Sequence, residues 1–109
     1  ISTLDDLENF VQNAKKPVMV DFWASWCENC KLLEKETFKD RKVYEILQNF
    51  DLVKIDVSKN GDEDLKLMQK FNVFGPPALI FYKNGKELKD LQITGFIDVK
   101  NFMKILGEI

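Results

Sequence analysis

Two cysteines that lie three residues apart, between an apolar segment and a helix-like one, constrain this chain more than any other feature. They belong to the segment 26–31, Trp-Cys-Glu-Asn-Cys-Lys, which follows the apolar run 17–23. Cys27 and Cys30 are the only cysteines among the 109 residues. The apolar run is typical of a buried strand, and the residues after Cys27 are typical of a helix. This arrangement predicts a redox site that alternates between two thiols and one disulfide.

The place of Cys27 at the beginning of the predicted helix distinguishes the two sulfurs. Unpaired backbone N–H groups and the helix dipole stabilise a thiolate at this position. We therefore expect Cys27 to be the exposed nucleophile, and Cys30, inside the helix, to be shielded. Glu28 adds a negative charge beside Cys27. Because like charges disfavour the thiolate, Glu28 is expected to tune the pKa of the Cys27 thiol.

The two cysteines could also hold a metal or form a purely structural disulfide. Zinc takes four nitrogen or sulfur ligands, whereas this chain has two cysteines and no histidine. A copper(I) pair is chemically possible because thiolates are soft ligands. A disulfide that closes so short a ring removes little entropy from the unfolded chain. We expect no metal and no cofactor, and a metal-binding or redox-inert interaction module stays open as an alternative of another class.

The composition is that of one globular domain, which we expect to cover residues 1–109. Hydrophobic residues make up 45% of the chain and charged residues 31%, so the chain is not predicted to be disordered. The net charge is −2 and there is no large basic block, which argues against nucleic acid as a partner. The apolar runs are shorter than the roughly 18 residues of a membrane helix. Because the sequence begins with isoleucine, we expect a processed product or a domain of a longer protein.

Apolar periodicity and turn residues predict helices that alternate with strands. Helices are expected to begin at Ser2 or Thr3, Cys27, Asp40, Asp62 or Glu63, and Asp98. Strands are expected over residues 18–23, 52–57, 78–82 and 87–93, the last two joined by an Asn-Gly hairpin. A right-handed crossover makes the first two strands parallel. We thus predict an α/β fold with a four-stranded mixed sheet, helices on both faces, and Cys27 at the carboxyl end of a central strand.

Two carboxylates are candidate partners of the cysteines. Asp21 lies in the buried strand before them, where it either forms structural hydrogen bonds or takes the proton of Cys30. We favour the second interpretation because the chain has no histidine to act as a base. Glu34 lies one helical turn after Cys30. It is either a surface charge paired with Lys31 or Lys35, or a second group beside the cysteines.

The segment 20–27, followed by Cys30 and Lys31, resembles the active-site segment of the thioredoxin family. Pro77, about fifty residues later and directly before a strand, matches the cis-proline of that family and is otherwise only a turn residue. Between the cysteines the chain departs from the family, since Glu28-Asn29 replaces Gly-Pro. The resemblance covers nearly the whole chain. It implies a thioredoxin fold, and it supports the role of Asp21.

A narrower resemblance is to the C-terminal periplasmic domain of DsbD-family thiol:disulfide interchange proteins. It is carried by the segments 16–21, 37–38 and 94–96, and by Cys30-Lys31 with Glu34. It implies a protein-disulfide reductase that needs no cofactor and acts on protein thiols and disulfides. A membrane-embedded dithiol domain of the same inner-membrane protein would supply the electrons, and a periplasmic domain would accept them. A free-standing thioredoxin, cytoplasmic and recharged by a flavin reductase, is the alternative within the same chemistry.

The residues before the family's cis-proline suit a particular kind of partner. In thioredoxin-like proteins the residue before that proline pairs through its backbone with an extended segment of the partner. Here that residue is Pro76, which has no N–H to donate. We therefore expect recognition to depend on a preformed surface of Trp26, Phe74 and Pro76. The simpler interpretations are that Trp26 covers the edge of the core and that Pro76 only stiffens the loop.

Overall fold

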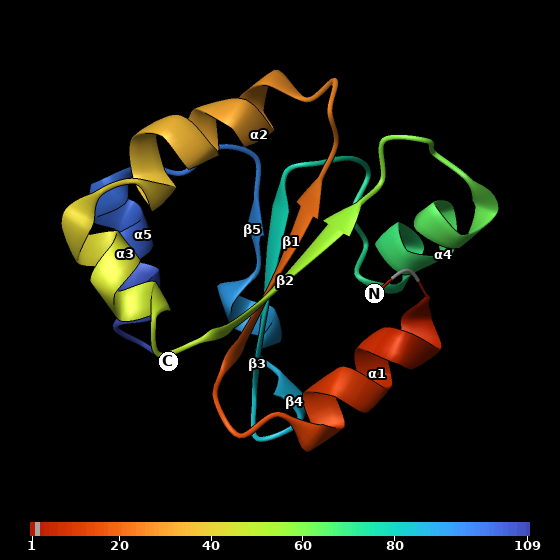
Figure 1. Cartoon of the computed structure of the whole chain (residues 1–109), viewed down its shortest axis with the longest axis horizontal. Coiled ribbons are helices and arrows are strands. Elements are labelled where there is room, and N and C mark those ends of the chain that lie inside the picture. The colour runs from red at the N-terminus through yellow and green to blue at the C-terminus, as the bar shows by residue number, and fades with distance from the viewer. Residues whose placement is uncertain (2) are drawn as a thin grey trace.

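A mixed β-sheet forms the centre of the molecule, and helices cover both of its faces (Figure 1). The computed structural model describes residue 1 and residues 3–109. The central strand β1 (Val18–Trp23) runs parallel to β2 (Asp51–Asp56) and antiparallel to β3 (Ala78–Lys83). The predicted order of parallel and antiparallel strands is therefore confirmed.

The return strand predicted over residues 87–93 is not continuous. It consists of two short strands, β4 (Lys86–Glu87) and β5 (Ile93–Thr94), with the 3-10 helix η2 (Lys89–Leu91) between them. Both strands pair with β3 on the edge that β1 leaves free, so together they occupy the fourth position of the sheet. The 3-10 turn leaves the sheet because Leu88 and Leu91 pack against the hydrophobic core on one of its faces.

The helices divide between the two faces of the sheet. Helices α1 and α4 contact each other on one face, while η1, α3 and α5 contact one another on the other. Their bounds are α1 Leu4–Asn13, α2 Glu28–Leu32, η1 Leu33–Phe38, α3 Arg41–Leu47, α4 Asp62–Lys70 and α5 Val99–Leu106.

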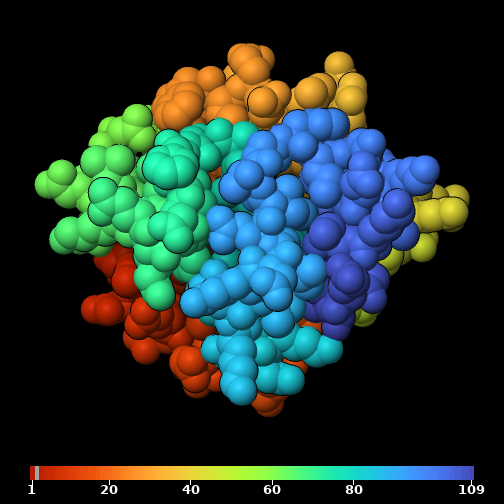
Figure 2. Space-filling view, turned by 180° about the vertical axis from the view of Figure 1, so that it is seen from behind, coloured from red at the N-terminus to blue at the C-terminus, as the bar shows by residue number. Residues whose placement is uncertain are grey.

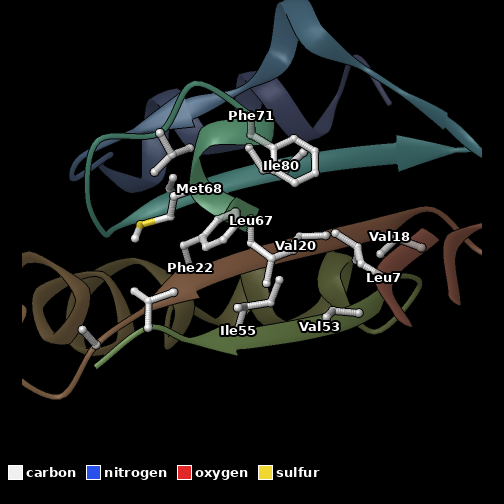
Figure 3. Packing of buried hydrophobic residues seen from close by; sticks show 14 of the residues in the cluster. Leu7, Val18, Val20, Phe22, Val53, Ile55, Leu67, Met68, Phe71 and Ile80 are labelled. Carbon is white, nitrogen blue, oxygen red and sulfur yellow. The ribbon is translucent and has the colours of Figure 1, made fainter. Parts of the chain in front are cut away.

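Alternation along β1 gives each face of the sheet its own core, because successive side chains of a strand point to opposite faces. Val20 and Phe22 face α1 and α4, and Figure 3 shows them with Leu67 and Phe71 in this cluster. Met19 belongs to the second cluster, with buried residues of α3 and α5. Both faces of β1 are thus covered, as its apolar sequence predicts.

Side-chain caps fix where three of the helices begin. Thr3 accepts a hydrogen bond from the backbone N–H of Asp6, whereas the alternative cap, Ser2, lies outside the described residues. Asp40 caps α3 and Asp98 caps α5, as predicted. Helix α4 begins at Asp62, the first of the two predicted positions.

The helix predicted over residues 27–37 is divided into the short α-helix α2 and the π-helix η1. The spacing of the buried residues Cys30, Leu33 and Thr37 is compatible with an α-helix as well as with a π-helix. The sequence pattern therefore does not distinguish the two helix types. Thr37 is fully buried, and its hydroxyl donates a hydrogen bond of 2.7 Å to the carbonyl oxygen of Ile97. This bond connects the helix that follows the cysteines to the segment before α5.

Replacing Thr37 with Val should reveal the contribution of this bond to stability. The variant keeps the shape of the side chain but leaves the Ile97 carbonyl oxygen without its hydroxyl donor. We expect the free energy of unfolding to fall by about 1–3 kcal/mol, measured by urea denaturation. Thr94→Val is the matched control because Thr94 is exposed, and it should change the free energy little. Equal urea midpoints for the two variants would contradict this interpretation.

Candidate active site

A short loop leads from the end of β1 to α2 at one end of the sheet (Figure 1), and the two cysteines lie at the beginning of this helix. Cys27 is the N-cap of α2, and its Sγ accepts a hydrogen bond of 3.1 Å from the backbone N–H of Cys30. The two residues form a disulfide, with their Cα atoms 5.3 Å apart. The sulfur of Cys27 therefore lies where the helix N-terminus offers a free N–H donor, the position that favours a thiolate.

The cysteines differ less in exposure than the sequence predicts. Cys27 is 6% exposed and Cys30 is 2% exposed. The expectation that Cys27 is exposed is therefore wrong for this disulfide-bonded state, although its accessibility is the greater of the two. The physical reason is that the bond to Cys30 and the accepted N–H draw the Cys27 sulfur back over the first turn of α2.

Trp26, directly before Cys27, is held by the loop that follows β2. Its indole Nε1 donates a hydrogen bond of 2.9 Å to the carbonyl oxygen of Ser58, and its side chain stays 52% exposed. The hydroxyl of Ser58 accepts the backbone N–H of Ser25 at 2.8 Å and donates to the carboxylate of Asp56. The backbone N–H of Ser58 also donates a hydrogen bond to the Asp56 carboxylate. The two bonds that Asp56 accepts, from the Ser58 hydroxyl and from its backbone N–H, hold the pKa of Asp56 below its usual range.

Sequence reasoning missed Ser58 because its role depends on contact between two segments far apart in the chain. The available signal was its position just after the second predicted strand. Parallel strands place their carboxyl ends at the same edge of a sheet, so the loop after β2 had to meet the loop after β1. The structure thus gives Trp26 a fixed orientation beside Cys27.

Asp21 and Glu34 belong to one charged cluster, in which Lys54 of β2 is the cation. Asp21 of β1 pairs in register with Lys54. Lys54 Nζ lies 3.5 Å from Glu34 Oε1 and 4.0 Å from the centre of the Trp23 ring. Of the two interpretations of Glu34, pairing with Lys31 or Lys35 of its own helix is therefore wrong, because the neighbouring strand β2 supplies the partner. Sequence reasoning also missed Lys54. The available signal was its place at an exposed position of a strand that was predicted to be parallel to β1.

Burial raises the pKa of Asp21 to about 7, while Lys54 opposes this shift and Glu34 adds to it. Desolvation is the largest effect because the carboxyl is mostly removed from water, and because Lys54 also pairs with Glu34. Cys30 Sγ lies 4.0 Å from the carbonyl oxygen of Phe22, the residue that follows Asp21. A carboxyl that is half protonated near neutral pH can accept or release a proton in the range in which thiols react.

Glu28 is the first residue of α2 and is well exposed to solvent. Its carboxylate lies 3.9 Å from Lys31 Nζ. Solvent and this cation therefore both reduce the electrostatic effect of Glu28 on Cys27. Its tuning of the Cys27 thiol stays a prediction.

The Pro76–Pro77 peptide bond is cis, as the family resemblance implies. Because Phe22 pairs with Ala78, the end of β1 and the beginning of β3 lie at the same edge of the sheet. Pro77 therefore lies at the edge from which the cysteine segment leaves, and Figure 2 shows these two segments, blue-green and orange, on one side of the molecule. The carbonyl oxygen of Pro77 accepts the backbone N–H of Gly95 at 2.9 Å. Gly95 has φ of +81°, a conformation that favours glycine.

Phe74 and Pro76, the other two residues predicted to contact a partner, differ in their exposure to solvent. Phe74 is fully exposed to solvent, whereas Pro76 is partly buried. Trp26, by contrast, keeps about half of its surface exposed while its indole is hydrogen-bonded. Of the two aromatic residues predicted to contact a partner, Trp26 is thus anchored by a hydrogen bond and Phe74 is fully exposed.

Within the described part of the chain, no three or more side chains of His, Cys, Asp or Glu come together as they would around a metal ion. Among the same residues, no helix has the length and apolarity that crossing a membrane requires.

Known proteins with similar sequences carry the name of a thiol:disulfide interchange protein. Over 104 residues the chain is 51% identical to DsbD of Campylobacter jejuni (strain RM1221), a match that covers 95% of this chain and 18% of that protein. It is 39% identical over 104 residues to DsbD of Salmonella typhi, covering 94% of this chain and 18% of that one. The chain thus spans less than a fifth of the length of these curated relatives.

The fold has a close counterpart among solved structures. The C-terminal domain of DsbD from Neisseria meningitidis, in its oxidised form, superimposes with a TM-score of 0.80 and 25% sequence identity, covering 99% of this chain and 97% of that one. In addition, residues 4–109 match the family model of the thioredoxin-like domain. Since this match includes the cysteine pair, the cis-proline and every strand of the sheet, the chain belongs to the thioredoxin-like domain family.

Proposed function

We propose that this domain is a protein-disulfide reductase that exchanges electrons through Cys27 and Cys30. The observation that carries the proposal is the cysteine pair at the beginning of α2, where Cys27 Sγ accepts a helix N–H. The similarity to thiol:disulfide interchange proteins and to the DsbD C-terminal domain supports the same chemistry.

The reaction proceeds in two exchange steps. The Cys27 thiolate attacks one sulfur of a partner disulfide, so that a mixed disulfide forms and the other partner sulfur leaves as a thiolate. Cys30 then loses its proton and attacks Cys27 Sγ, which releases the first partner sulfur. The partner gains two electrons and two protons, and Cys27–Cys30 becomes the disulfide. Asp21 accepts the Cys30 proton, and Glu34 and Lys54 set the charge around it.

The place of the domain in an electron relay is part of the same proposal. By analogy with DsbD, the domain belongs to a longer inner-membrane protein and lies in the periplasm. A membrane-embedded dithiol domain recharges Cys27–Cys30, and a periplasmic domain accepts the electrons. A flavin reductase that recharges the isolated domain as fast as it recharges a thioredoxin would favour a free-standing thioredoxin instead.

The first prediction concerns the two sulfurs. Cys30→Ala removes the resolving thiol, so the mixed disulfide through Cys27 should persist. We expect this variant to accumulate a covalent complex with a disulfide-containing protein, seen by non-reducing electrophoresis and mass spectrometry. Cys27→Ala is the matched control and should form little complex, because the remaining sulfur is the less accessible one. Equal trapping by both variants would show that the roles are wrongly assigned.

The second prediction concerns the ionisation of Asp21. Its pKa is about 7 in the folded state and roughly 3.9 in an unfolded chain. The folded state therefore binds more protons between these values, and the free energy of unfolding should fall as the pH rises from about 4 to above 7. Asn does not ionise, so Asp21→Asn should be more stable than the unchanged protein at pH 8, on the order of 2–4 kcal/mol. Urea denaturation at pH 5 and pH 8 measures both effects.

The same variant separates a chemical role of Asp21 from a structural one. If Asp21 takes the Cys30 proton, Asp21→Asn should slow the release of the mixed disulfide and remove the rate transition near pH 7. Stopped-flow tryptophan fluorescence over pH 5–9 follows this step. If the variant is more stable but keeps the original pH–rate profile, Asp21 affects stability only and does not take the Cys30 proton.

The third prediction concerns partner recognition. Pro76→Thr supplies the backbone N–H that proline lacks, and one hydrogen bond contributes about 0.5–1.5 kcal/mol. The rate with an unstructured disulfide peptide should therefore rise roughly two- to tenfold. Phe74→Ser is the complementary variant, and it should mainly slow the reaction with a folded partner domain because it removes exposed apolar surface. An unchanged peptide rate for Pro76→Thr would mean that the missing donor does not set selectivity.

A further inference from the structure

A groove of about 530 Å³ lies between β2, η1 and α3, away from the cysteines. In Figure 1 these elements are the yellow-green strand and the gold and yellow helices on the same side of the sheet. Its lining includes Met19, Leu47 and Val53, but neither cysteine and none of the residues Trp26, Phe74, Pro76 and Pro77. The volume lies within the range of small-molecule sites, which are mostly apolar with a few polar groups.

Two large side chains at the rim of the groove are exposed to solvent although most of their surface is apolar. Tyr44 of α3 is 60% exposed and Leu52 of β2 is 55% exposed. Strand β2 is the outermost strand on this side of the sheet, so no further strand of the described chain covers its outer edge. An apolar molecule in the groove would remove these side chains from water.

The charges that line the groove determine which kind of apolar molecule fits. Lys39, Lys54 and Asp21 line it. Lys54 pairs with Glu34, whereas Lys39 forms no ion pair with any residue that the structure describes. Lys39 is thus a cation at the groove without an ion-pair partner among the described residues, while burial favours the neutral form of the Asp21 carboxyl. This balance is complementary to an anion.

We propose that the groove binds a small apolar molecule that carries one acidic group, with its apolar body against Met19, Leu47 and Leu52 and its acid beside Lys39. The groove shares no residue with the predicted contact surface of Trp26, Phe74, Pro76 and Pro77, but it shares Asp21 with the proposed proton transfer.

The acid in the wall of the groove gives the site a pH signature. The charged groups around Asp21 are Lys54 of β2 and Glu34 of η1, with Lys39 at the end of η1. An ionised Asp21 repels a bound anion, so the affinity should fall as the pH rises through the range in which Asp21 loses its proton. Asp21→Asn should bind the anion with the same affinity at both ends of this range.

The test uses 8-anilinonaphthalene-1-sulfonate, an apolar anion whose sulfonate stays charged and whose fluorescence rises in apolar surroundings. Titration of the folded domain should give saturable binding at one site. Amide shifts in two-dimensional NMR should centre on residues 38–54. The affinity should fall at least about threefold from pH 6 to pH 8. Shifts confined to another surface, or fluorescence that never saturates, would overturn the proposal without any variant.

Paired variants test each half of the site. Lys39→Glu should weaken binding about three- to tenfold, whereas Lys42→Glu, which changes an exposed lysine outside the groove, should not. Leu52→Asp should abolish binding, whereas Leu65→Asp, at a similarly exposed leucine on α4, should leave it unchanged. Equal effects within either pair would overturn the assignment. Sedimentation of the free domain is the remaining check, since a dimer that covers Leu52 would make a second copy the occupant.

Discussion

The pairing of β1 with β2 on one side and with β3 on the other determines where every part of the site lies. Through β2, it brings Lys54 beside Asp21 and the Ser58 loop against Trp26. Through β3, it brings the cis-proline to the edge from which the cysteine segment leaves. Because both faces of β1 are buried, a shift of one residue in its register would exchange Val20 and Phe22 with Met19 and Asp21 between the two cores.

The charged cluster of Asp21, Glu34 and Lys54 contributes little to stability. Glu34 and Lys54 are both about half exposed, and such ion pairs contribute roughly 0–1 kcal/mol. Burial of Asp21 outweighs the attraction of Lys54, as the raised pKa of that carboxyl indicates. The domain therefore keeps an acid that costs stability above neutral pH. This cost in stability is the reason why we propose a role for Asp21 in proton transfer.

The surface near the cysteines and the groove beside β2 have opposite characters. Around the cysteines, Trp26 is oriented by a hydrogen bond and Phe74 projects freely into solvent, an arrangement suited to the surface of another protein. The groove is concave, mostly apolar, and accompanied by a lysine without an ion pair in the described chain, which suits a small anion instead. Asp21 lies in the wall of the groove and one residue before Phe22, whose carbonyl oxygen faces Cys30 Sγ. It therefore connects the two regions.

Much of the fold and the centre of the site could be predicted from the sequence, because the forces involved act over a few residues. The spacing of Cys27 and Cys30 determined a disulfide at a helix N-terminus. The apolar run 18–23 indicated β1, and capping side chains indicated where α3 and α5 begin. Family resemblance, and not local physics, supplied the cis bond before Pro77.

Only the tertiary structure decided what depends on which distant segments meet. Glu34 pairs with Lys54, and not with a lysine of its own helix, because β2 lies beside β1. The return strand is divided in two, because Leu88 and Leu91 gain more from the core than from the sheet edge. Cys27 is nearly buried, because its sulfur bonds to Cys30 over the first turn of α2. Propensities and spacing act along the chain, whereas burial, register and charge pairing act across it. The pKa of Asp21 is raised because burial outweighs the opposing charge of Lys54, which the register places beside it.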